Sequence, residues 1–191
     1  MLAALSARSQ RIAGLVAVLT ITQLIFGLPA LAADSVLQQV SGGTRTASIS
    51  EATMSGLTYS HNSQSNDHNL NLTVDDSSGT GEGWNVTVQS SNFVYSGLYN
   101  GADINASAFE IITANSPAFI SGQAIDGANG PMVPASNSTG SLDVARKVLH
   151  ANAGYGQGSY SQTIGVRLTV PGTTRAGSYT SSMTVTIASG P

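Results

Sequence analysis

The sequence predicts an all-β fold, an antiparallel β-sandwich of immunoglobulin-like or jelly-roll-like type, for the region that follows an apolar N-terminal segment. That region is rich in Ser, Thr, Gly and Asn and poor in Lys, Glu and Leu, a composition that disfavours helices and suits strands joined by turns. Several segments alternate between apolar and polar residues, which is typical of strands with one buried and one solvated face. Turn signals separate these segments, as expected of a sandwich or a barrel.

The first 33 residues have the pattern of a secretory signal peptide. Two arginines precede an almost wholly apolar run over residues 12–32, which ends in the small-x-small triplet Ala30-Leu31-Ala32. A permanent membrane anchor is the alternative, because the run approaches the roughly 20 residues that span a bilayer. Pro29 and the alanine-rich exit favour cleavage directly after the triplet or one residue later. Residues 34–191 are then expected to form one mature domain.

Charge and cysteine content exclude several classes of partner and site. The chain has seven basic and ten acidic residues, and two of the basic residues lie in the signal peptide, so the mature net charge is five minus ten, or −5. Such a surface repels nucleic acids and anionic lipids, so we expect neither a nucleic-acid partner nor a membrane partner after signal cleavage. The chain has no cysteine, which excludes disulfides, thiol nucleophiles and Cys-ligated zinc.

Three segments alternate most clearly and are expected to be half-buried strands: residues 84–88, 164–170 and 179–187. In the first, Trp84, Val86 and Val88 share one face. In the last, Val185 and Ile187 face one way while the threonines between them face the other. Because only a short connection separates the second and third strands, we expect these two to pair as neighbours.

Weaker strand candidates are residues 45–50, 55–60, 69–74, 108–113 and 144–150. The last of these could instead form one short helix, because its apolar residues are also compatible with helical spacing. Turn signals lie between the candidates at Ser41-Gly42-Gly43, Asn66-Asp67, residues 75–83, Pro171-Gly172 and Arg175-Ala176-Gly177. Residues 116–140 contain three prolines and many Gly, Ser and Asn, so a long surface loop is expected there.

Two segments together resemble the WxL domain of surface proteins from Gram-positive bacteria. The first, Leu70–Phe93, has an apolar strand, an Asp-led turn and then Trp84-Asn85-Val86, with valine in the leucine position of the family's Trp-x-Leu motif. The second, Val148–Pro191, has a Gly-rich stretch, Val170-Pro171, Ala176-Gly177-Ser178-Tyr179 and a final strand that ends in proline. That strand has Val185-Thr186-Ile187 where the family has its second Trp-x-Leu motif.

The resemblance implies an exported domain that is held on the cell surface without covalent attachment. Its implied partner is peptidoglycan or another cell-wall polysaccharide, and members of the family often act beside other surface proteins. The two motif positions make Trp84, Val86, Val185 and Ile187 the candidate wall-binding residues. No cofactor and no metal ion is implied.

Trp84 also has a simpler interpretation as a core residue. An aromatic ring can stack on a sugar, but Trp84 shares its face with Val86 and Val88. A core position is therefore the favoured interpretation, and both roles are compatible if the ring lies at the edge of the core.

The acidic turn and the histidines are both interpreted as structural and not as metal-binding. The turn that holds Asp75, Asp76, Ser78, Thr80 and Glu82 is rich in the oxygen ligands that Ca²⁺ prefers. Its spacing does not match an EF-hand and its glycines suit a tight turn, so a solvated hairpin is favoured. The histidines are too scattered in the sequence to indicate a metal site: they are His61, His68 and His150.

Three classes of function remain after these steps. The first is a surface domain that adheres to the cell wall, as the resemblance implies. The second is a structural subunit of a surface fibre or layer, assembled by strand addition. The third is a secreted hydrolase, which is disfavoured because the chain has neither a Gly-x-Ser-x-Gly nor a His-Glu-x-x-His motif. We therefore expect a binding protein and not an enzyme.

Overall fold

Strands dominate the computed structural model, which describes residues 37–191. It is 48% strand and 2% helix, so the all-β prediction is confirmed. The predicted signal peptide, residues 1–33, lies outside the described residues. The elements are β1 (Arg45–Ile49), β2 (Gln64–Asp76), β3 (Trp84–Ser90), β4 (Val94–Ser96), the 3₁₀ turn η1 (Ala106–Ala108), β5 (Phe109–Ala114), β6 (Ala118–Gly122), β7 (Gly140–Ser141), β8 (Arg146–Ala151), β9 (Gly158–Val170), β10 (Ser178–Thr180) and β11 (Met183–Ser189).

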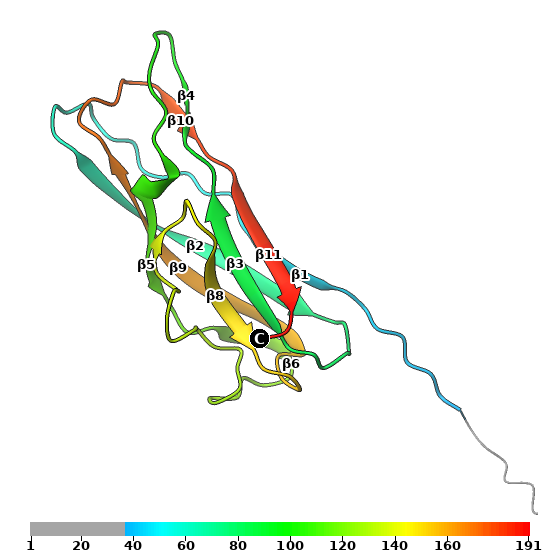
Figure 1. The fold of residues 1–191 in the computed structure, drawn as a ribbon. Coiled ribbons are helices and arrows are strands. Elements are labelled where there is room, and N and C mark those ends of the chain that lie inside the picture. Colours follow the sequence, from blue (N-terminus) through cyan, green and yellow to red (C-terminus); the bar gives the residue numbers. More distant parts are fainter. Residues whose placement is uncertain (1–36) are drawn as a thin grey trace, which may run out of the picture. The chain divides into compact units, whose positions relative to one another are not determined.

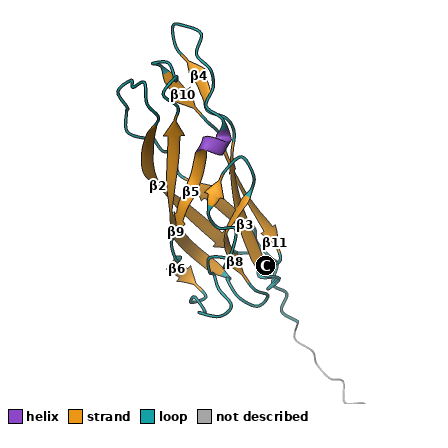
Figure 2. Ribbon diagram, turned by 60° about the vertical axis from the view of Figure 1, so that its left-hand side comes forward, coloured by secondary structure: helices purple, strands orange, loops and turns teal. Residues whose placement is uncertain are grey.

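Two antiparallel sheets face each other within residues 40–191 (Figure 1). The larger sheet has the order β1-β2-β9-β5-β7, and β6 also pairs with β9. The smaller sheet has the order β11-β3-β8. Turning the molecule shows the two layers from the side, with the short ribbon of β4 and β10 beyond one end of them (Figure 2). The predicted antiparallel sandwich is therefore confirmed.

The core lies between the inner faces of the two sheets. On the larger sheet, β2 and β9 are each 13 residues long and place Leu70 opposite Ile164 and Val74 opposite Tyr160. All four side chains are buried, as are Trp84, Val86 and Val88 on β3 of the smaller sheet. Removing such side chains from water contributes about 1.5–3 kcal/mol each, which is what holds the layers together.

The expected pairing of residues 164–170 with residues 179–187 is wrong. Residues 164–170 form the end of β9 in the larger sheet, whereas residues 179–187 are divided between β10 and β11 and pair with β4 and β3. The chain therefore crosses from one layer to the other between β9 and β11, by way of the β4–β10 ribbon. Both segments bury an apolar face, and the crossing lets them bury these faces against the same core from opposite sides.

Three other local expectations have different outcomes in the structure. Asn66-Asp67 is not a turn but part of β2, where Arg167 of β9 lies opposite Asp67 and holds both carboxylate oxygens at 2.7 Å. This hydrogen bond lowers the pKa of Asp67. Residues 55–60 form an irregular connection and not a strand. Residues 146–151 form a strand, as expected for residues 144–150, and not the alternative helix, because β8 pairs with β3 in the smaller sheet.

The inner face of the smaller sheet provides a matched pair for testing burial. Val88 on β3 lies directly opposite Val185 on β11, but Val88 is 1% exposed whereas Val185 is only partly buried. We expect Val88→Asp to lower the free energy of unfolding by several kcal/mol, of the order of the whole stability, because its carboxylate would be buried without a partner. Val185→Asp should cost less, since a side chain on the edge strand can reach water. Urea denaturation of residues 34–191 measures both, and equal losses would contradict the difference in burial.

Candidate functional site

The structure brings the four residues of the two motif positions together on one sheet face. In the antiparallel pair of β3 and β11, Ile187 lies opposite Val86, and Val185 lies two residues further along, opposite Val88. Trp84 and Val86 are both 0% exposed, while Val185 and Ile187 are partly buried against the core. All four therefore face the interior, and neither Trp84 nor Val86 offers a surface to a polymer.

The indole of Trp84 is held by a Gly-rich connection. Its Nε1 donates a hydrogen bond to the carbonyl oxygen of Gly156 at 2.9 Å, and its ring lies 6.3 Å from the ring of Tyr160 on the opposite sheet. Gly156 has φ +79°, and a Cβ there would lie 2.7 Å from Nε1 and 2.5 Å from the Cβ of Ala151. Only glycine fits this position without displacing the indole.

The oxygen-rich turn between β2 and β3 is organised by an arginine. Arg45 on β1 places Nε 3.1 Å from Asp76, Nη2 2.6 Å from Thr80 and Nη1 3.3 Å from Glu82. Nη1 also donates to Ser189 on β11 at 2.7 Å. Within the described part of the chain, no cluster of three or more His, Asp or Glu could hold a metal ion. The guanidinium of Arg45 contacts this turn and links the edges of the two sheets.

The three histidines serve different parts of the fold. His61 lies edge-on to the ring of Tyr59, with centroids 5.3 Å apart, and His68 lies in β2. On β8, burial and the nearby charge of Lys147 lower the pKa of His150, which favours its neutral form.

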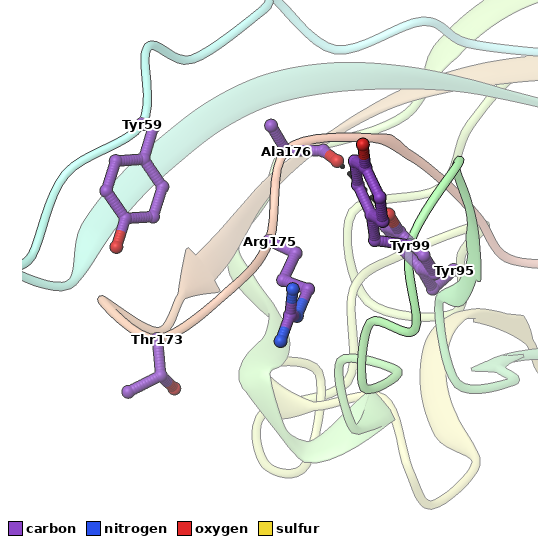
Figure 3. A pocket seen from close by; sticks show the side chains of 6 residues that line it. All are labelled: Tyr59, Tyr95, Tyr99, Thr173, Arg175 and Ala176. Carbon is purple, nitrogen blue, oxygen red and sulfur yellow. Dashed lines mark hydrogen bonds between the residues drawn. The ribbon is translucent and has the colours of Figure 1, made fainter.

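A cleft of about 430 Å³ lies near the β4–β10 ribbon, and sequence reasoning did not find it (Figure 3). Three parts of the chain that are distant in sequence form the cleft, so no local sequence motif predicts it. We call it the tyrosine cleft; its lining residues are Tyr59 from the β1–β2 connection, Tyr95 and Tyr99 from β4 and the loop after it, and Thr173, Arg175 and Ala176 from the β9–β10 connection. Loops held by a rigid scaffold are a common place for binding sites.

Two tyrosine hydroxyls hold the β9–β10 connection in place. Tyr95 donates to the carbonyl oxygen of Ala176 at 3.2 Å, and Tyr179 donates to that of Arg175 at 2.7 Å. Their rings lie 5.3 Å apart. Burial raises the pKa of Tyr179, so its hydroxyl keeps the proton that it donates. The backbone of Gly177 lies so close to the ring of Tyr95 that a Cβ would overlap it.

The cleft combines aromatic faces with a cationic donor. Tyr59 and Tyr99 are 55% and 69% exposed. In Figure 3 the side chain of Arg175 projects between Tyr59 on one side and Tyr95 and Tyr99 on the other. Such a surface can pack against an apolar ring face and donate hydrogen bonds at the same time.

Comparison with known proteins identifies one family. The sequence model of the family described as WxL domain, surface cell wall-binding, matches residues 35–191. No curated protein and no solved structure matches the chain. Among residues 37–191 there is no helix of the length and apolarity needed to cross a membrane.

Two glycines of the connection that covers Trp84 test how tightly the indole is held. Gly154 and Gly156 have φ +84° and +79°, but an added Cβ meets other atoms only at Gly156. We expect Gly154→Ala to cost about 1–2 kcal/mol of stability from backbone strain, and Gly156→Ala to cost about 1–3 kcal/mol more from overpacking. Fluorescence of Trp84, the only tryptophan, follows unfolding in urea. Equal losses for the two variants would contradict the close contact between Gly156 and the indole.

Proposed function

The chain belongs to the WxL domain family of surface cell wall-binding proteins, and we propose that it attaches to the wall without a covalent link, by binding peptidoglycan or another cell-wall polysaccharide. The observation that carries this proposal is the family match, which spans residues 35–191 and so includes the whole described sandwich. The protein is accordingly located at the cell surface, in contact with the cell wall.

Charge supports a binding mode that does not depend on electrostatic attraction. The mature chain has a net charge of five minus ten, or −5, so anionic wall polymers repel the protein as a whole. Outward-facing side chains are largely hydroxyls and amides, such as the exposed Thr184 and Thr186 on β11. Binding is therefore expected to use hydrogen bonds and aromatic contacts, which salt screens weakly.

The acidic residues support binding over catalysis. Glycoside hydrolysis uses two carboxyl groups that face each other across the scissile bond. Asp76 and Glu82 lie near each other, but both contact the guanidinium of Arg45. This arrangement uses the two carboxylates to hold the turn, and the family is described by wall binding.

A second surface favours contact with other surface proteins. Every residue of β6 is exposed, and within the described chain β6 pairs only with β9. Its side chains include Phe119 and Ile120, which are 50% and 54% exposed. An edge strand with free backbone groups and exposed apolar side chains can accept a strand from another molecule. We propose β6 as the place where a neighbouring protein, or a second copy of this chain, adds a strand.

Wall binding is tested by co-sedimentation of residues 34–191 with purified bacterial cell walls. We expect the protein to sediment, with the bound fraction falling by less than about threefold between about 0.05 and 0.5 M NaCl, because few charged contacts contribute. The same protein without walls is the control. A protein that stays in solution would contradict wall binding, and binding that vanishes at high salt would contradict the proposed mode of contact.

Strand addition at β6 is tested by sedimentation velocity over a range of protein concentrations. If copies of the chain add strands to one another, the mature protein should form assemblies that grow with concentration. Ile120→Lys should disperse them, because a charged side chain on an edge strand opposes further pairing. Val144→Lys, which replaces an exposed apolar side chain outside β6, is the matched control. A monomer at all concentrations would exclude self-assembly through this edge.

A further inference from the structure

We propose that the tyrosine cleft binds a saccharide unit that carries an anionic group, with the sugar ring against a tyrosine face and the anion on Arg175. This inference rests on the proposed wall-binding function and names the surface and the ligand chemistry that carry it. The proposed wall contact thus lies on residues from three separate connections, and not on Trp84 and Val86, which are buried.

The cleft is preformed, which lowers the entropic cost of binding. Tyr95 is wedged among glycine backbones, since a Cβ at Gly97, Gly101 or Gly177 would overlap its ring. Its hydroxyl fixes the carbonyl of Ala176, as described above. The volume of about 430 Å³ falls within the range of about 300–1,000 Å³ that is typical of sites for small ligands. One or two sugar units are the scale of ligand that such a space admits.

The exposed tyrosines supply the faces on which a sugar ring would pack. Tyr59 is braced edge-on by His61, at an interplanar angle of 79°, and its hydroxyl lies 3.4 Å from Nδ1 of that histidine. Tyr99 is the more exposed of the two. Tyrosine is suited to this role, because it offers a large amphipathic surface and loses little conformational entropy on binding. Its ring contacts the apolar face of a sugar while its hydroxyl hydrogen-bonds the rim.

Arg175 supplies the preference for an anionic group. Of the other three arginines in the described sandwich, Arg45 and Arg167 are held by carboxylates, those of Asp76 and Asp67, and Arg146 donates to the carbonyl oxygen of Ser141. Among the described residues no carboxylate pairs with Arg175, and the nearby Asp103 accepts the backbone N–H of Tyr95. A guanidinium has five N–H donors and no acceptor, and it binds carboxylates and phosphates in a bidentate manner. In a wall polymer this anion is either a carboxylate of peptidoglycan or a phosphodiester of an attached glycan.

The test compares binding isotherms of residues 34–191 and its variants on two probes. One probe is intact cell walls, and the other is walls from which hydrofluoric acid has removed phosphodiester-linked polymers. The variants are Tyr99→Ala and Arg175→Gln. Leu98→Ala is the matched control for the first, because Leu98 is an exposed neighbour that does not line the cleft. Lys147→Gln is the control for the second, because it changes the net charge equally but lies in β8. Fluorescence of Trp84 checks that each variant folds.

We expect Tyr99→Ala to weaken binding about tenfold and Arg175→Gln about fivefold, with both controls within about twofold of wild type. Arg175→Gln should also remove the remaining dependence on salt. Binding that survives the acid treatment assigns the anion to a carboxylate, and binding that is lost with the phosphodiesters assigns it to phosphate.

Three results would overturn parts of this scheme separately. Wild-type sedimentation with unchanged binding by both folded variants would exclude the tyrosine cleft and leave wall binding in place. Unchanged binding by Arg175→Gln alone would exclude the anionic group. A wild-type protein that sediments with neither wall preparation would overturn the proposed function, and the cleft assignment with it.

Discussion

The fully buried indole of Trp84 is the contact at which the parts of this sandwich meet. The residue belongs to β3 of the smaller sheet, its ring packs near Tyr160 of the larger sheet, and its N–H is bonded to the Gly-rich connection at Gly156. A buried N–H without an acceptor costs about 1–3 kcal/mol, so the connection must follow the path that places this carbonyl. The tryptophan thereby fixes the path of the connection between β8 and β9.

This packing lies at one end of the sandwich, and the proposed binding cleft lies at the other end. The start of β3, where Trp84 lies, is next to the turn held by Arg45, whose guanidinium reaches β11 as well as β2. In Figure 1 the ribbon of β4 and β10 extends from the other end of the sheets. There the connections are anchored by hydroxyl-to-carbonyl bonds from Tyr95 and Tyr179 and leave aromatic rings exposed. A rigid end and a surface of exposed loops are what a small binding domain requires.

The sequence predicts those features that depend on local periodicity. Alternation in residues 84–88 predicts the inward face of β3, and the same reasoning places Val185 and Ile187 on the inner face of β11. It fails where a distant partner decides the outcome. Asn66-Asp67 has turn-forming residues, yet Arg167, 100 positions further along the chain, holds Asp67 in an extended strand. The tyrosine cleft cannot be predicted from the sequence for the same reason, because its residues come together only in the folded chain.

Because Trp84 of the first motif is buried, the absence of a tryptophan at the second motif also concerns the packing of the core. By the resemblance to the family motif, Val185 takes the position of the second tryptophan, and it faces the core opposite Val88 from a partly exposed edge strand. Val88 is itself buried, so a larger ring at position 185 would have to fill space at the rim of a core that aliphatic side chains already occupy. Valine is much smaller than tryptophan, so this exchange keeps the apolar pattern of the inner face but not its volume. The substitution of valine is therefore a change in how the sandwich edge is packed, and it removes no aromatic face from the surface on which the tyrosine cleft lies.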